Sequence, residues 1–294
     1  MFLQTFQLMP QTIQNILVPG TIVLCLAALL GILIVIVSHF FQMPVNEKKE
    51  ALAAALPGAN CGGCGFAGCD GYAQFLADGS TDTSLCAVGG AACSAELASI
   101  LGIAATFAEP SVAHLLCQGT QDHTKRRYEY LGTLTCNAAH GLLGGPGACT
   151  YGCLGFGDCI TVCAFHALSV KNGIIQVDSK ACTACGQCVK MCPKDLMQLF
   201  PRSAEVAVLC KNTWPGAQTR KNCYTGCIGC QKCAKTCPVC AISMTGALAV
   251  IDQTLCTRCG ACVKVCPTHS IAYLEQPLEN DSVKLIYAMV FRRL

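Results

Sequence analysis

The residues best suited to chemistry in this chain are its cysteines, 27 in a sequence of 294 residues. Three runs have the form C-x2-C-x2-C-x3-C-P, and they begin at Cys182, Cys227 and Cys256. In bacterial iron–sulfur proteins the first three thiolates of such a run bind one [4Fe–4S] cluster, and the fourth binds its neighbour. Structural zinc sites use two separated pairs of ligands instead. Three exact copies therefore predict iron–sulfur clusters rather than zinc.

The crossover of the fourth cysteine predicts which thiols share a cluster. In the last pair of clusters, site 4 comprises Cys227, Cys230, Cys233 and Cys266, and site 5 comprises Cys256, Cys259, Cys262 and Cys237. In the preceding pair, site 3 comprises Cys182, Cys185, Cys188 and Cys163. Site 2 departs from the pattern, because Phe156 stands where a cysteine is expected. For site 2 the sequence predicts Cys149, Cys153, Cys159 and Cys192.

A different arrangement lies nearer the N-terminus. Site 1 is predicted from Cys61, Cys64, Cys69 and Cys86, four thiols that suit one [4Fe–4S] cluster held by a loop and the helix after it. Glycines at 62, 63, 65 and 68 let this loop bend tightly and offer backbone N–H groups to the cluster.

Five clusters account for twenty cysteines and leave seven: Cys25, Cys93, Cys117, Cys136, Cys210, Cys223 and Cys240. We interpret Cys240 as a spare thiol beside a cluster. A sixth centre that uses some of Cys136, Cys210 and Cys223 stays open, and buried inert thiols are the alternative.

The two pairs of clusters lie in repeated segments. A shift of 74 residues carries every cysteine from Cys136 to Cys192 onto another cysteine, without an insertion or deletion. A fixed period indicates repeated structural units, so we predict a first module at 136–209 and a second module at 210–276. GIIQVD (173–178) and ALAVID (247–252) are matched β-branched segments, each predicted to form a strand.

The rest of the chain must anchor and connect these modules. Residues 1–46 contain no Asp, Glu, Lys or Arg, and 21–41 are long and apolar enough to cross a bilayer as one helix. Lys48 and Lys49 then place the remainder on the cytoplasmic side. We further predict a single-cluster domain at 47–92, a helical connector at 93–135 and a tail at 277–294, giving an α+β fold.

Two details of the connector carry alternatives. Ser94 is expected to cap a helix that Pro110 divides into two segments. The cations Lys125, Arg126 and Arg127 are interpreted as part of a solvated loop, with a docking patch for an acidic protein as the alternative.

The sequence shows no catalytic residues. It has no P-loop, no G-x-G-x-x-G run after a strand, and no Ser–His–Asp spacing. Only 13% of the residues are charged and the net charge is +3, so nothing points to nucleic acid. These features favour an electron carrier with several clusters.

The segments ANCGGCGFAGCDGYA, CAVGG, YEYLG and YGCLGFGDC, in this order with the paired ferredoxin modules, identify a family resemblance. The chain resembles the iron–sulfur B subunit of the Rnf complex, a bacterial ion-translocating ferredoxin:NAD+ oxidoreductase, in its long form with two dicluster modules. The likeness covers essentially the whole chain. Cys240 departs from it, because an acidic residue is expected there.

The resemblance implies one component of a translocase in the bacterial cytoplasmic membrane, anchored by a single pass. It implies electron transfer from soluble ferredoxin to the NAD-reducing flavin subunit, while integral membrane subunits move Na+ or H+. The alternatives are an anchor protein of another membrane oxidoreductase and an iron–sulfur sensor.

Overall fold

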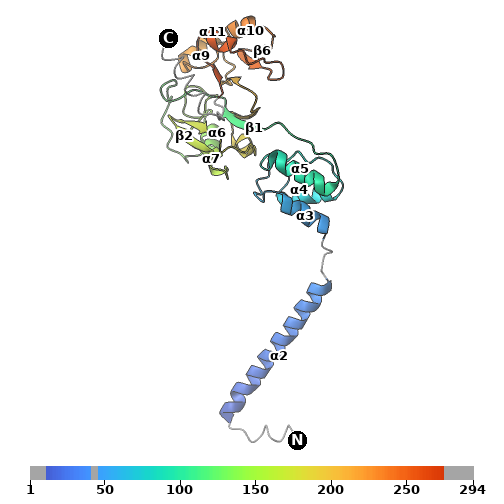
Figure 1. The fold of residues 1–294 in the computed structure, drawn as a ribbon. Helices are drawn as coiled ribbons and strands as arrows, with labels where there is room; N and C mark the ends of the chain where they lie inside the picture. Colours follow the sequence, from blue (N-terminus) through green and yellow to red (C-terminus); the bar gives the residue numbers. More distant parts are fainter. Residues whose placement is uncertain (1–10, 41–45, 275–294) are drawn as a thin grey trace. The chain divides into compact units, whose positions relative to one another are not determined.

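The computed structural model describes residues 11–40 and 46–274, shown as coloured ribbon in Figure 1. The predicted tail at 277–294 lies outside the described residues. The chain divides into two compact units, 1–47 and 48–294. The first contains helix α2 (Gln11–Phe40), in which the 21 residues from Pro19 to His39 are strongly apolar. At 1.5 Å per residue they span roughly 31 Å, the thickness of a bilayer's hydrocarbon core.

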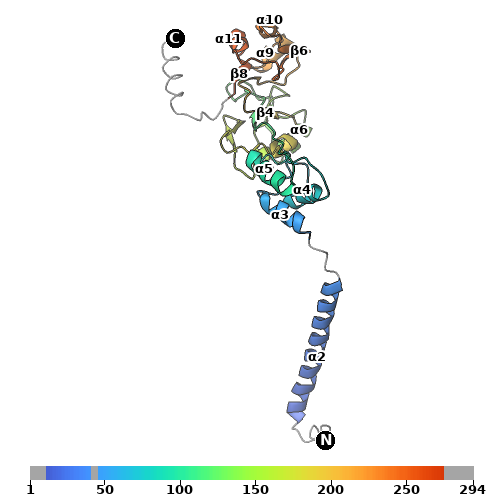
Figure 2. The ribbon, with the colours of Figure 1, turned by 45° about the vertical axis from the view of Figure 1, so that its right-hand side comes forward.

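Three helices form the domain around site 1: α3 (Glu47–Ala55), α4 (Cys69–Ala77) and α5 (Gly90–Leu101). They lie together in both ribbon views (Figures 1 and 2). Their shared core contains the fully buried side chains of Leu52, Leu76 and Leu97. Burial of this apolar face stabilises three helices that would each be too short to form alone.

The expected cap at Ser94 is wrong. Helix α5 begins at Gly90, four residues earlier, and Ser94 is buried within it. The Ser94 hydroxyl donates to the carbonyl oxygen of Thr106 at 2.6 Å and also pairs with the hydroxyl of Thr83 at 2.9 Å. The serine therefore ties the helix to neighbouring loops instead of capping it.

The expected helical connector is also wrong. Helix α5 belongs to the domain of site 1, so no domain boundary falls at residue 93. Residues 111–115, the second expected helical segment, form strand β1 (Ser111–Leu115), which pairs antiparallel with β4 (Met197–Pro201). Pairing with a strand far along the chain overrides the local helical spacing.

Each module consists of a β-hairpin, a second strand pair and short helices. In the first module, β2 (Leu168–Lys171) pairs with β3 (Ile174–Val177), and the helices are α7 (Asp158–Thr161) and α8 (Gln187–Met191). In the second, β6 (Ile242–Thr245) pairs with β7 (Leu248–Ile251), and β5 (Val206–Val208) pairs with β8 (Ile271–Tyr273). Its helices are α9 (Gly216–Asn222), α10 (Lys232–Thr236) and α11 (Ala261–Val265), labelled together in Figure 2. The strands predicted at 173–178 and 247–252 are confirmed as β3 and β7.

The structure aligns the start of the two modules differently from the sequence. Leu115 pairs with Met197 as Val208 pairs with Ile271, and Leu116 donates to the Leu196 carbonyl as Leu209 donates to the Ser270 carbonyl, each at 2.7 Å. Strand β1 is therefore equivalent to β5, and Cys117 rather than Cys136 is equivalent to Cys210.

The two alignments differ because the first module contains an insertion. Cys117 precedes Cys149 by 32 residues, whereas Cys210 precedes Cys223 by 13, so the first module carries 19 more residues here. The longer segment includes Cys136 and helix α6 (Cys136–Gly141). The match of Cys136 with Cys210 in the ungapped comparison is coincidental.

Arg127 fastens this longer segment. Its guanidinium donates to the carbonyl oxygens of Gly147, Leu143 and Gly145, at 2.9, 2.8 and 2.8 Å. One of the three cations singled out in the sequence is therefore structural, since five-donor guanidinium groups suit several carbonyl acceptors at once.

Candidate iron–sulfur centres

Several cavities of similar volume, about 300 to 380 Å³, are each lined by at least four cysteines. Three of them bring together the complete predicted ligand sets of sites 1, 3 and 4. Site 4 shows the crossover directly, because Cys266 lies with Cys227, Cys230 and Cys233 and not with the other cysteines of its own run. The sequence rule for exchanging the fourth ligand therefore matches the geometry.

Site 5 is recognised from its contacts. The pKa of the Cys262 thiol is raised, mainly by burial. The nearby thiols of Cys256 and Cys259 also act to raise it. Cys237 packs against the core that contains Cys262 and accepts a hydrogen bond at Sγ from the backbone N–H of Ala241, at 3.3 Å. The predicted set is thus gathered around α10 and α11.

Backbone geometry positions the ligand loops of sites 3, 4 and 5. A residue with positive φ precedes the short helix of each run: Gly186 before α8, Gln231 before α10 and Gly260 before α11. This left-handed residue turns the chain sharply between the second and third cysteine. The third cysteine of each run, such as Cys188, is then buried in the first turn of its helix.

Several sulfur atoms accept hydrogen bonds, as cluster thiolates do. Cys182 Sγ accepts from the N–H of Ala113 at 3.5 Å, and Cys86 Sγ from the N–H of Gly89 at 3.4 Å. Burial acts to raise the pKa of Cys266, but hydrogen bonds from Ser270 and neighbouring backbone groups outweigh it and lower the pKa. These contacts stabilise sulfur in its ionised, iron-binding form.

Site 2 differs from the prediction in one residue. Its cavity is lined by Cys136, Cys153, Cys159 and Cys192, whereas Cys149 lines a different cavity. Cys136 is the first residue of α6, and its thiol lies beside the backbone of Phe156, the position at which the repeat lacks a cysteine. Burial raises the pKa of the Cys136 thiol, and hydrogen bonds from the backbone N–H groups of Asp158, Phe156 and Gly157 partly offset this effect.

Two polar groups hold Cys136 in this place. The carboxylate of Asp158 accepts hydrogen bonds from the backbone N–H groups of Cys136 and Asn137, at 2.8 and 3.1 Å. Thr135 caps α6 by accepting from the N–H of Ala138 at 3.2 Å. An N-cap and a carboxylate at the same helix terminus typically contribute about 1 kcal/mol each. The signal in the sequence was Thr135 directly before Cys136.

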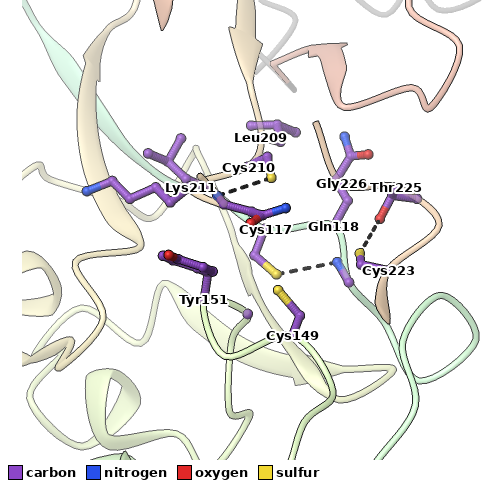
Figure 3. A pocket seen from close by; sticks show the side chains of 14 residues that line it. Cys117, Gln118, Cys149, Tyr151, Leu209, Cys210, Lys211, Cys223, Thr225 and Gly226 are labelled. Carbon is purple, nitrogen blue, oxygen red and sulfur yellow. Dashed lines mark hydrogen bonds between the residues drawn. The ribbon is translucent and has the colours of Figure 1, made fainter. Parts of the chain in front are cut away.

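The remaining cavity has a volume of about 300 Å³ and is lined by Cys117, Cys149, Cys210 and Cys223, whose thiols gather around it in Figure 3. We call this group the intermodule site, because it takes two cysteines from each module. Burial raises the pKa of Cys117 to about 11 and that of Cys210 to about 12. Sequence reasoning left Cys210 and Cys223 open as ligands of a sixth centre, together with Cys136, and it counted Cys117 among the leftover cysteines without giving it a role.

The thiols of these cavities surround a space rather than converge on one point. Across residues 11–40 and 46–274, no three His, Cys, Asp or Glu side chains are placed to share a single metal ion. A cubane presents its four irons at separate corners, so its ligands must be spread in this way. Four thiols per cavity with N–H donors to sulfur fit [4Fe–4S] clusters.

Site 1 lies against site 3. The cavity of site 1 is also lined by Cys185. The side-chain amide of Gln187 donates to the carbonyl oxygen of Cys61, and Lys190 Nζ donates to that of Gly62 at 3.3 Å. A Cβ atom on Gly63 would lie only 2.7 Å from the carbonyl oxygen of Cys185. Only glycine allows the two ligand loops to approach this closely.

The remaining thiols line none of these cavities. Cys240 is exposed, with φ of 53°. Cys93 is buried in the core of the site 1 domain, and its thiol donates to the carbonyl oxygen of Ala55 at 3.4 Å. The interpretation of Cys240 as a spare thiol stays a prediction, whereas Cys93 lies in apolar packing.

Comparison with known proteins agrees with this division of the chain. Residues 56–88 match a family model described as a putative Fe-S cluster, and residues 175–197 and 249–272 match a 4Fe-4S binding domain. The first match lies on the domain of site 1, and the other two lie on the modules.

Individual proteins similar to this chain carry related names. The chain is 42% identical over 213 residues to the B subunit of the Na(+)-translocating ferredoxin:NAD(+) oxidoreductase complex of Acetobacterium woodii, covering 72% of this chain and 64% of that protein. It is 39% identical over 228 residues to the B subunit of the ion-translocating oxidoreductase complex of Methanosarcina acetivorans, covering 77% and 86%. Identity to the B subunit of the proton-translocating ferredoxin:NAD(+) oxidoreductase complex of Clostridium ljungdahlii is 41% over 247 residues, covering 83% and 86%. The chain therefore belongs to the family of iron–sulfur B subunits of the Rnf-type, ion-translocating oxidoreductase complexes.

Proposed function

We propose that this chain is the electron-input protein of its complex, taking electrons from reduced ferredoxin and passing them toward an NAD-reducing flavin subunit. The observation that carries the proposal is the set of cavities lined by cysteines in one continuous body of protein. Bound [4Fe–4S] clusters supply one-electron transfer over a wide range of potentials. Other proteins of the complex would couple this transfer to the movement of Na+ or H+.

The ligands proposed for four of the five clusters follow the cavities, and those of site 5 follow the contacts among its cysteines. Sites 1, 3, 4 and 5 keep their predicted sets, and site 2 uses Cys136, Cys153, Cys159 and Cys192. The protein's part is to hold these thiols, to set how far each is exposed to water and to donate N–H groups to sulfur. Each of these effects tunes a reduction potential.

The ligand sets of neighbouring sites are close to one another. Cys185 of site 3 lines the cavity of site 1. Cys159 of site 2 shares a hydrophobic core with Cys188 of site 3, and Cys233 of site 4 shares another with Cys262 of site 5. This contiguity supports a relay more than it supports a sensor, which needs no series of centres.

A partly buried lysine, Lys194, lines the cavity of site 2. Lys194 Nζ donates to the carbonyl oxygen of Gly152 at 2.9 Å, and burial lowers its pKa while the thiolates of Cys149 and Cys117 act to raise it. A positive charge here would stabilise added electrons at the adjoining sites, because the local dielectric constant is low.

The membrane unit gives the proposal its location. Helix α2 is long and apolar enough to anchor a membrane-associated protein. We propose that the iron–sulfur domains lie on the cytoplasmic side, because Lys48 and Lys49 follow the helix and the first 46 residues carry no Lys or Arg.

Reduced ferredoxin tests the proposed donor. When it is mixed anaerobically with the purified full chain in detergent, the chain's iron–sulfur absorbance should bleach. Dithionite should bleach the same absorbance, which controls for intact clusters. Bleaching by dithionite but not by ferredoxin would contradict the proposed donor and favour another membrane oxidoreductase or a sensor.

Gly63→Val should separate site 1 from site 3, because a side chain there meets the backbone of Cys185 at 2.7 Å. We expect the iron content to stay constant while the EPR broadening between the two reduced clusters decreases. Gly71→Ala is the matched control, since its Cβ would contact only Phe66 at an ordinary 3.5 Å. Unchanged broadening in Gly63→Val would show that the two loops do not pack as described.

A further inference from the structure

The intermodule site contains four thiols that none of the five proposed clusters uses (Figure 3). We propose that Cys117, Cys149, Cys210 and Cys223 hold a sixth [4Fe–4S] cluster, which joins the first module to the second. Each thiol would release its proton as its sulfur bonds to one iron of the incoming cluster. Neither family model that matches the chain includes any of these four residues.

The first argument is the likeness of this cavity to the others. Like the cavity lined by the ligands of site 4, it is lined by four cysteines that come from separate segments of the chain. Inert buried thiols have no reason to gather in fours around one space.

The second argument is a repeated pattern of hydrogen bonds. Cys117 Sγ accepts from the backbone N–H of Gly119 and of Cys153, each at 3.4 Å. Cys210 Sγ accepts from the N–H two residues later, that of Asn212, at 3.4 Å and from that of Cys227 at 3.3 Å. Cys153 and Cys227 are themselves equivalent in the repeat. Each module thus presents one thiol at the end of its equivalent strand, with the same two donors.

The other two ligands are equivalent as well. Cys149 and Cys223 are related by the shift of 74 residues. Their thiolates interact electrostatically with each other and with that of Cys117. Two equivalent pairs that face one cavity form a pseudo-symmetric set of four, which suits a cubane with four equivalent corners.

Polar and aromatic contacts fix the walls of the intermodule site. The Tyr151 ring meets the Trp214 ring edge-on with centroids 5.3 Å apart, and the Tyr151 hydroxyl pairs with that of Thr213 at 2.9 Å. Buried Asn212 donates to the hydroxyl of Thr219 at 2.6 Å. Such contacts hold ligands from two modules in a defined geometry.

The position of the intermodule site gives the sixth cluster a role. Its thiols Cys117 and Cys210 accept hydrogen bonds from the backbones of Cys153 and Cys227, which are ligands of sites 2 and 4. The ligand sets therefore adjoin in the order site 1, site 3, site 2, intermodule site, site 4, site 5. Without the intermodule site this series would be interrupted between the modules.

Native mass spectrometry of the full chain, released from detergent under anaerobic conditions, tests the proposal. We expect the wild type to carry six [4Fe–4S] clusters and the double variant Cys210→Ala/Cys223→Ala to carry five. Cys240→Ala is the control, because it removes an exposed thiol that lines none of the cavities, and it should keep six.

Each outcome decides the proposal. Five clusters in the wild type, a zinc ion in place of the sixth, or six clusters in the double variant would overturn it. If the double variant does not fold, Cys149→Ala must lose the sixth cluster or one of its irons, and an unchanged set of six cubanes would overturn the proposal. This count needs no electron donor, so failure of ferredoxin to reduce the chain would leave the sixth cluster untouched.

Discussion

Cys136→Ala is expected to remove the cluster of site 2, while the other clusters remain. The substitution removes one of four ligands from a cavity whose other thiols are Cys153, Cys159 and Cys192. No replacement is at hand, because Phe156 occupies the corresponding place in the repeat and Cys149 faces the intermodule site. Iron per chain should fall by about four atoms, or by about one if a three-iron cluster persists.

The matched variant is Cys149→Ala, which the sequence alone would predict to have the same effect. The structure instead predicts that Cys149→Ala leaves the Mössbauer and EPR signals of site 2 intact and changes those of the intermodule site. Identical losses in the two variants would show that both cysteines serve one cluster. That result would restore the assignment derived from spacing and contradict the insertion in the first module.

Cys266→Ala is expected to destroy the cluster of site 4 and to spare that of site 5, although its own run supplies site 5. Cys266 lines the cavity of Cys227 and Cys230 and lies in the core of the second module. The substitution would therefore remove a cluster whose other three ligands lie more than thirty residues earlier in the sequence.

Two single variants identify which cluster is lost. Cys230→Ala and Cys259→Ala remove exposed ligands of sites 4 and 5, so neither should disturb the core. The EPR difference spectrum of Cys266→Ala should match that of Cys230→Ala and differ from that of Cys259→Ala. A match with Cys259→Ala would refute the crossover.

Local spacing was enough to predict which cysteines line the cavities of sites 1, 3 and 4, because most of these cysteines lie on one short loop. In the run from Cys182 to Cys188, a turn at Gly186 and a single helical turn bring three sulfurs to one cavity. The fourth ligand follows from the rule of paired clusters. Little tertiary information is needed for such sites.

Site 2 and the intermodule site depend on long-range packing, which spacing does not encode. The sequence comparison matched Cys136 with Cys210 because the shift of 74 requires no gap. Strand pairing shows the true equivalence, since β1 and β5 stand in the same register against β4 and β8. The similar segments LLC (115–117) and VLC (208–210) hint at this equivalence in the sequence. The hint can be recognised only once the strands that pair with them are known.

The connector shows the same limitation. The residues SVAHL were assigned to a helix from their spacing, yet they form β1 because β4 offers a partner 82 residues away, from Leu115 to Met197. Burial of Val112 and Ala113 in the module outweighs the weak local preference. Helix propensity was a fair guide only where the apolar face met a core nearby, as in α5.

Anomalous density at the iron edge, collected on the full chain within its complex, tests the central claim of a continuous series of clusters. The account predicts six compact iron peaks, one within each four-thiol set, with the peak of the intermodule site between those of sites 2 and 4. An empty space among Cys117, Cys149, Cys210 and Cys223, or a peak there at the zinc edge only, would break the series and contradict the account.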